Sequence, residues 1–114
     1  MKINKIDELA SENVQMTDAK NVVLKILIGP DDDSKDIIMR HFTVLPGGHT
    51  PLHNHEFEHV IKIEKNKGIM IDKNGREHEV GPGHCAYVEP NEKHQFKNPF
   101  DEPFEFICII KGSK

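Results

Sequence analysis

Apolar and polar residues alternate along most of this chain, in short runs separated by turn residues. Val22 to Ile28 is apolar and β-branched and stops at Gly29-Pro30, which predicts a first strand. Asp36 to Leu45 alternates with apolar residues on both faces, so a strand covered on both sides is expected there. Pro46-Gly47-Gly48 is expected to end that strand.

The second half of the chain repeats this pattern in shorter runs. Asn74-Gly75 predicts a hairpin, because both residues accept the positive φ angles of a type I′ turn. Residues 1–20 are expected to form an N-terminal arm. The rest of the chain has about eight short strands and no convincing amphipathic helix, which is typical of an all-β sandwich or barrel. The later strands are expected at residues 69–71, 76–80, 84–88, 94–98 and 104–110.

Composition narrows the class of protein. A chain of 114 residues suits a single domain over residues 1–114. The net charge of −4 is dispersed, without the basic stripe of a nucleic-acid-binding protein. No apolar run approaches the ~20 residues of a membrane span, and Met1 to Ala10 lacks the apolar centre of an export signal. Cys85 and Cys108 are therefore expected as reduced thiols in a soluble, cytoplasmic protein.

Histidines gather in one stretch, since four of the eight lie between Pro46 and His59. On an extended strand His53, His55 and His59 would share one face, which continues into apolar core positions. Rings at i and i+2 can reach one ion, and a third ligand four residues on keeps the same face. We interpret the group as a metal site. Solvated loop histidines are the alternative, whereas an affinity tag is excluded because the residues are internal and spaced.

The same stretch resembles the first motif of the cupin superfamily. Gly47, five residues, His53-Asn54-His55, three residues and His59 follow that motif, with His59 in place of the usual Glu. Asn66 lies at the family's glycine, and Asn tolerates a left-handed turn. The second motif is matched by Gly83, Glu89-Pro90-Asn91, His94 and Asn98, with Glu89 and Asn91 in place of Pro and Gly. The resemblance covers about residues 36–110.

Among cupins, the chain resembles the small one-barrel, manganese-binding thermophilic type, whose sites have four histidines and no carboxylate. The similar segments are Arg40 to Gly48, Pro90 to Phe96 and Glu105 to Cys108. This resemblance implies a double-stranded β-helix (jelly-roll) barrel, a homodimer, and oxygen chemistry on small unsaturated substrates. It also implies a complete ligand set of His53, His55, His59 and His94.

Four neutral imidazoles would leave one divalent transition metal per chain with its full charge. If two adjacent coordination positions are open, the site suits Mn or Fe, with Ni, Cu or Zn as alternatives set by supply. Strand parity predicts a substrate pocket beside the metal, in which Arg40 either binds a substrate carboxylate or forms a surface ion pair. Cys108 is expected to be a small buried residue rather than a nucleophile. The predicted pocket residues are Arg40, Phe42, Phe96, Phe106 and Cys108.

Two functions follow from these residues. The first is a metal-dependent oxidoreductase of the dioxygenase type that acts on a small organic substrate. The second is a non-catalytic module that binds or senses a small molecule, because no general base stands out. Nucleic acid and membrane are not expected partners. A homodimer could use the strand at Val22 to Ile28, which is suited to extending a partner's sheet.

Overall fold

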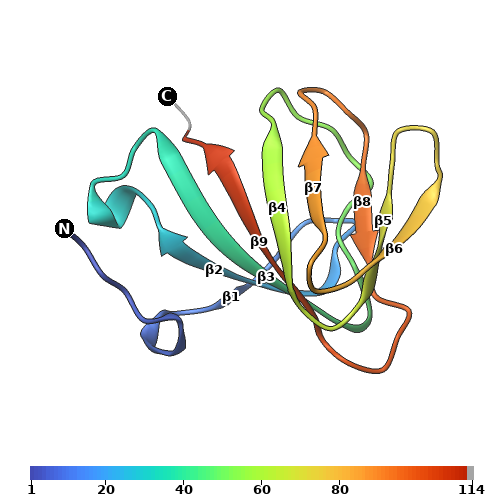
Figure 1. The fold of residues 1–114 in the computed structure, drawn as a ribbon, viewed down its shortest axis with the longest axis horizontal. Helices are drawn as coiled ribbons and strands as arrows, with labels where there is room; N and C mark the ends of the chain where they lie inside the picture. Colours follow the sequence, from blue (N-terminus) through green and yellow to red (C-terminus); the bar gives the residue numbers. More distant parts are fainter. Residues whose placement is uncertain (113–114) are drawn as a thin grey trace.

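The computed structural model describes residues 1–112, and its regular secondary structure is almost entirely β-strand (Figure 1). The all-β class predicted from the sequence is confirmed. Two short 3-10 helices, η1 (Ile6–Glu8) and η2 (Pro30–Asp32), interrupt the strands. The strands are β1 (Glu12–Asn13), β2 (Lys20–Ile28), β3 (Ile37–His49), β4 (His59–Lys65), β5 (Gly68–Ile71), β6 (Glu77–Val80), β7 (Cys85–Val88), β8 (Gln95–Lys97) and β9 (Phe104–Lys111).

Strand β3 joins the two halves of the sheet. Its first part, Ile37 to Val44, pairs with β9, which continues through β4 to β7. Its last residue, His49, pairs with Lys97 of β8, which continues through β5 to β6. The two halves therefore diverge from one long strand and curl toward each other as a half-open barrel (Figure 1).

The core fills the inside of this curl. Residues of even number on β3 and β9 lie opposite one another, among them the pairs Val44–Phe104 and Phe42–Phe106. Val44, Phe104 and Phe106 are almost completely buried. Buried Asn98 ties the loop before β9 to this core, because its amide donates to the carbonyl oxygens of Val44 (2.8 Å) and Glu102 (2.7 Å).

The left-handed turn predicted at Asn66 is present, and Asn91 adopts the same conformation. Asn66 and Asn91 stand where the family has glycine, and their φ angles are 60° and 65°. Gly83 also has a positive φ, of 99°. Both asparagines thus adopt the backbone conformation that the motif requires, without the glycine.

Three local predictions were wrong. β3 does not end at Pro46 but continues to His49, since Gly47 takes a φ of 80° and lets the strand bend there. The hairpin after β5 has a positive φ at Gly75 but not at Asn74, so its turn is not type I′. His53 to Glu58 form a loop and not a strand, and β4 begins only at His59.

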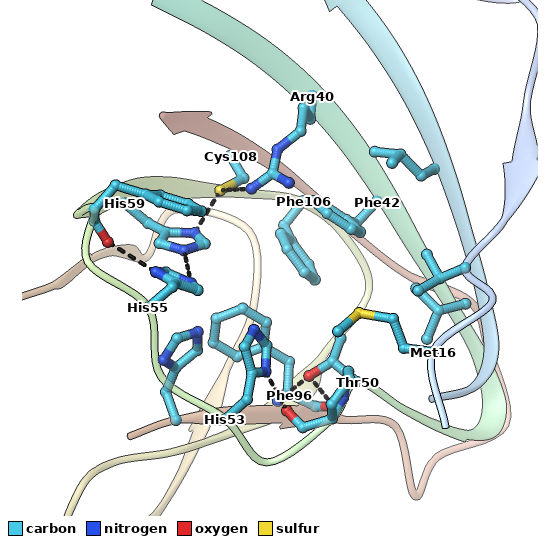
Figure 2. Close-up of a pocket in the computed structure, with 16 residues that line it drawn as sticks. Met16, Arg40, Phe42, Thr50, His53, His55, His59, Phe96, Phe106 and Cys108 are labelled. Carbon is cyan, nitrogen blue, oxygen red and sulfur yellow. Dashed lines mark hydrogen bonds between the residues drawn. The ribbon is translucent and has the colours of Figure 1, made fainter. Parts of the chain in front are cut away.

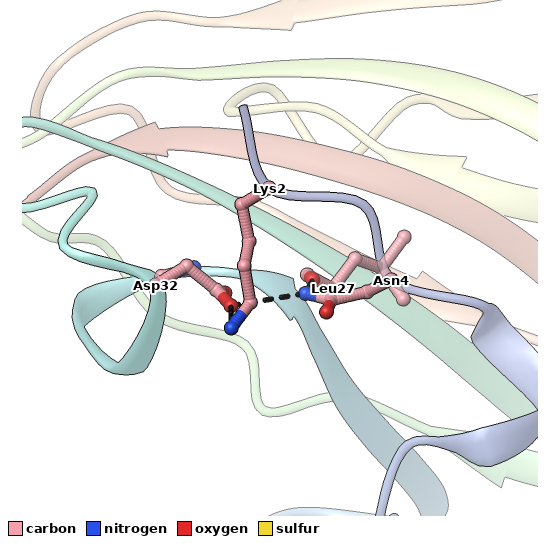
Figure 3. Close-up of polar contacts among 5 residues, drawn as sticks. Lys2, Asn4, Leu27 and Asp32 are labelled. Atoms are coloured by element: carbon pink, nitrogen blue, oxygen red, sulfur yellow. Dashed lines mark hydrogen bonds and ion pairs between the residues drawn. The ribbon is translucent and has the colours of Figure 1, made fainter.

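The N-terminal arm lies along the outer edge of β2. β1 pairs with Val23 and Leu24 of β2, while the other edge of β2 pairs with β3 of the same sheet. Further along this edge, the Asn4 side chain donates to the Leu27 carbonyl oxygen at 2.9 Å and to Asp32 (Figure 3). The edge that was expected to extend a partner's sheet is therefore largely occupied by the chain itself.

Residues 1–112 contain no helix long and apolar enough to cross a membrane.

Candidate metal centre

The four predicted ligands come from separate parts of the chain and meet at one end of the curl. His53 and His55 lie in the loop between β3 and β4, His59 is the first residue of β4, and His94 directly precedes β8. The main chains of His53 and His94 exchange two hydrogen bonds, of 3.2 and 3.0 Å, which fix the loop against β8. The prediction placed these rings on one face of a single strand. In the structure, main-chain pairing between segments far apart in the sequence brings them together.

The rings form a compact group. The ligand nitrogens of His53, His55 and His94 lie within 4.8 Å of one another. His59 joins them through its Nε2, which is 2.5 Å from Nε2 of His55 (Figure 2). Phe57 stacks on His55 with ring centroids 3.9 Å apart and restricts the tilt of that imidazole.

Hydrogen bonds at Nδ1 set the protonation of three rings. Nδ1 of His53 lies 2.9 Å from the Pro51 carbonyl oxygen, Nδ1 of His55 lies 2.9 Å from that of Phe57, and Nδ1 of His94 lies 2.7 Å from that of Glu92. A carbonyl oxygen only accepts, so each Nδ1 must carry the proton. Each Nε2 is then left with a lone pair, and an imidazole held in this way is suited to bind a metal.

The partner of His59 is different. Its Nδ1 lies 2.8 Å from Sγ of Cys108, and the same sulfur accepts a hydrogen bond of 3.3 Å from Nη2 of Arg40 (Figure 2). His59 and Cys108 are 5% and 1% exposed, so water has little access to this contact. The sulfur therefore fixes the orientation of the His59 ring.

The electrostatics favour uncharged rings. Burial, reinforced by the neighbouring His55 and by Arg40, lowers the pKa of His59 to about 3. Burial also lowers the pKa of His55 and of His94. Neutral imidazole is the form that binds metal, so these rings need lose no proton to do so at neutral pH.

This donor set fits a divalent cation. The ligand nitrogens of three imidazoles lie close together, Nε2 of His59 contacts Nε2 of His55, and no carboxylate is among the residues that line the cavity. Facing lone pairs repel one another unless a cation or a shared proton lies between them. The chemistry of an all-imidazole set suits Mn, Fe, Ni, Cu or Zn rather than Mg or Ca. The ligand roles of the four residues remain a prediction.

A cavity of about 370 Å³ opens from the histidines into the barrel. Every pocket residue predicted from the sequence lines it, namely Arg40, Phe42, Phe96, Phe106 and Cys108. The prediction omitted seven further residues. These are Val14, Met16, Val22, Leu24, Thr50, Pro51 and Phe57.

The omitted residues differ in how visible they were in the sequence. Val22 and Leu24 lie opposite Val44 and Phe42, so strand parity could have placed them on the inside. Met16 belongs to the arm, which has no apolar periodicity, and its position depends on the pairing of β1 with β2. No pattern in the sequence gives that contact.

A family comparison agrees with this fold. Residues 40–110 match the Cupin_2 family of cupin domains, and the chain belongs to this family. It is therefore a small cupin with a three-histidine group able to hold a metal, beside which His59 lies.

Solved structures and a curated protein give further similarities. The polyketide cyclase RemF from Streptomyces resistomycificus superposes with a TM-score of 0.92 at 28% identity, covering 97% of this chain and 79% of RemF. A predicted oxalate decarboxylase from Thermotoga maritima superposes with a TM-score of 0.85, at 20% identity, over 99% of this chain and all of the other, which is a likeness of fold.

The curated protein is 1-methylthio-D-xylulose 5-phosphate methylsulfurylase from Rhodospirillum rubrum, which is 31% identical over 77 residues, or 67% of this chain. This chain spans about half the length of that relative, 48%.

Proposed function

We propose that this cupin is a metal-dependent oxidoreductase of the dioxygenase type, acting on a small and mostly apolar organic substrate. The observation that carries the proposal is the group of four imidazoles at the end of an otherwise apolar cavity. The ligand nitrogens of His53, His55 and His94 lie within 4.8 Å of one another, Nε2 of His59 contacts Nε2 of His55, and three of the Nδ1 atoms are bound to main-chain carbonyl oxygens. A redox metal such as Mn or Fe supplies Lewis acidity and one-electron chemistry at such a site.

The residues of the chain have distinct tasks in this proposal. His53, His55, His59 and His94 hold the ion, and Phe57 and Cys108 keep two of these rings in place. Phe42, Phe96 and Phe106 form an aromatic wall, with Phe96 and Phe106 at a centroid distance of 5.2 Å and Phe42 and Phe106 at 5.3 Å. An apolar wall excludes water and places a flat substrate beside the ion.

Oxygen consumption tests the proposal. Protein loaded with Mn or Fe should consume oxygen in the presence of small unsaturated substrates, and the His55→Ala variant should not. Equal consumption by His55→Ala would contradict the role of the site. Consumption by neither protein across a broad panel would remove the dioxygenase assignment.

A reaction without oxygen is the second candidate, and the similarity to RemF favours it. RemF is named a polyketide cyclase and is 28% identical over 97% of this chain, and closing a ring between two carbons of one molecule does not by itself consume oxygen. In this alternative the ion would act only as a Lewis acid on a carbonyl oxygen. Turnover of a polycarbonyl substrate under strict exclusion of oxygen would support it. Tight ligand binding without any turnover would instead support a non-catalytic binding or sensing module.

We also propose that the chain forms a homodimer through the outer face of β4, β7 and β9. Val60 and Tyr87 are 48% and 55% exposed there, beside Ile107 and Ile109, and an apolar sheet face of this kind suits a contact with a second copy. Analytical ultracentrifugation should give the mass of two chains, and Val60→Asp should give one. A wild-type mass of one chain would contradict the dimer.

The proposed location is the cytoplasm, in keeping with an exposed free thiol at Cys85.

A further inference from the structure

Arg40 is the one cationic side chain among the residues that line the cavity, within the described part of the chain. It projects from β3 toward Cys108 of the neighbouring β9, and its Cζ lies 4.9 Å from the centre of the Phe42 ring (Figure 2). The guanidinium thus lies against the aromatic wall, two contacts away from His59 through the Cys108 sulfur.

The guanidinium is poorly satisfied where it lies. No carboxylate in residues 1–112 pairs with it, and its one hydrogen bond to protein goes to a thiol sulfur. Its Nε is buried and has no hydrogen-bond partner in that part of the chain. A guanidinium has five N–H donors, so a role limited to holding Cys108 would leave most of them unused. A partly buried charge without a counter-ion is costly, and the fold retains it here beside an apolar cavity.

We propose that Arg40 is the specificity residue of this cavity and that its ligand is a flat, apolar organic anion, with a carboxylate or enolate on Arg40. This substrate class deepens the proposed function and rests on it for its catalytic meaning. The anion lies on the guanidinium while the ring packs on Phe42 and Phe106, inside the same cavity that the four histidines line.

Charge and size support this class. A divalent ion held by the uncharged donors of imidazole rings would add its positive charge to that of Arg40, and the lining contains no acidic residue to balance either. A guanidinium binds carboxylates through two parallel hydrogen bonds, which a neutral amide of the same shape cannot reproduce. The cavity of about 370 Å³ is at the small end of ligand sites and suits one or two fused rings.

The test compares 2-naphthoate with 2-naphthamide, which have the same ring system and differ in charge. Binding is measured by calorimetry on metal-free full-length protein, so that neither ligand can bind an ion. Wild type should bind the anion on the order of tenfold more tightly than the amide. Arg40→Met should abolish this preference, and Arg40→Lys should keep part of it. The matched control is Arg76→Met, because Arg76 lies on the exposed β5–β6 hairpin.

Each possible result either supports the proposed role of Arg40 or contradicts it. Equal affinity of wild type for the two ligands, or binding of neither at millimolar concentration, would overturn the proposal, and so would an unchanged preference in Arg40→Met. Should Arg40→Met fail to fold, loss of part of the preference in Arg40→Lys still supports the proposal and an unchanged preference refutes it. The metal content of wild type is measured separately. If the wild type prefers the anion but binds no metal, the role of Arg40 is supported and the proposed oxidoreductase function is contradicted.

Discussion

Replacement of Cys108 by alanine tests whether the thiol positions His59. In the native structure Nδ1 of His59 lies 2.8 Å from the sulfur, and both side chains are almost fully buried. In Cys108→Ala the buried Nδ1 has no hydrogen-bond partner, and water has no easy access to supply one. The imidazole then either keeps an unsatisfied Nδ1 or rotates its Nε2 away from the other three rings.

The size of the effect follows from these two outcomes. A lost hydrogen bond costs about 1 kcal/mol, and the vacated sulfur adds about 1 kcal/mol as a small cavity, so the free energy of unfolding should fall by about 2 kcal/mol. Loss of a partner that orients a metal-binding histidine typically lowers metal affinity about 10- to 100-fold. Cys108→Ser keeps an acceptor in place and should lie between Cys108→Ala and wild type.

Competition with a chromophoric chelator measures the Mn²⁺ affinity of each variant, and urea unfolding measures stability. Cys85→Ala is the matched control, because Cys85 is exposed on β7 and away from the cavity. Equal Mn²⁺ affinities in Cys108→Ala and Cys85→Ala would refute the positioning role of the thiol.

Three further predictions concern pH, packing and the mouth of the cavity. For metal-free protein, an unfolded chain protonates His59 as the pH falls below 6.5, whereas in the folded chain burial lowers the pKa to about 3. The free energy of unfolding should therefore fall by about 1–2 kcal/mol between about pH 6.5 and 5, after allowance for solvent in the cavity. Urea titrations should show a smaller fall for His59→Gln, and an equal fall would contradict the assignment. Asn98→Ala removes two hydrogen bonds to carbonyl oxygens and one from the Phe100 N–H, and should cost about 2–4 kcal/mol in urea unfolding, against little for the exposed Asn54→Ala. A cost below that of Asn54→Ala would show that Asn98 does not hold the loop. Met16→Ala should weaken calorimetric binding of 2-naphthoate by about threefold to tenfold through lost apolar contact, with Leu52→Ala as the control. Equal affinities in the two variants would show that the arm does not form a wall of the cavity.

The sequence predicted the barrel because its strands alternate and its turns carry Gly, Asn and Pro. Asn66 illustrates this well, since its left-handed conformation follows from the motif even though glycine is absent. The alternation of side chains along a strand also placed Arg40 with Phe42 and Phe106 with Cys108, and the register of β3 and β9 sets these two pairs opposite one another.

Other features depend on contacts between distant segments. The grouping of His53 and His55 was predicted from a strand that is in fact a loop, and the main-chain bridge to His94 is what holds that loop. The contribution of Met16 depends on two residues of β1 pairing with β2, which leaves no periodic signal in the chain. The contact of His59 with Cys108 joins residues 49 positions apart and needed the β4–β9 register to be seen.

The most direct test of the metal centre is elemental analysis of untagged protein after reconstitution with Mn, Fe, Ni, Cu or Zn. Four single variants, His53→Ala, His55→Ala, His59→Ala and His94→Ala, accompany the wild type, with His78→Ala on the exposed hairpin as control. About one ion per chain is expected in wild type and in the control, with a clear loss in each of the four variants. Wild type without metal after reconstitution, or four variants that retain it fully, would contradict the four-histidine centre.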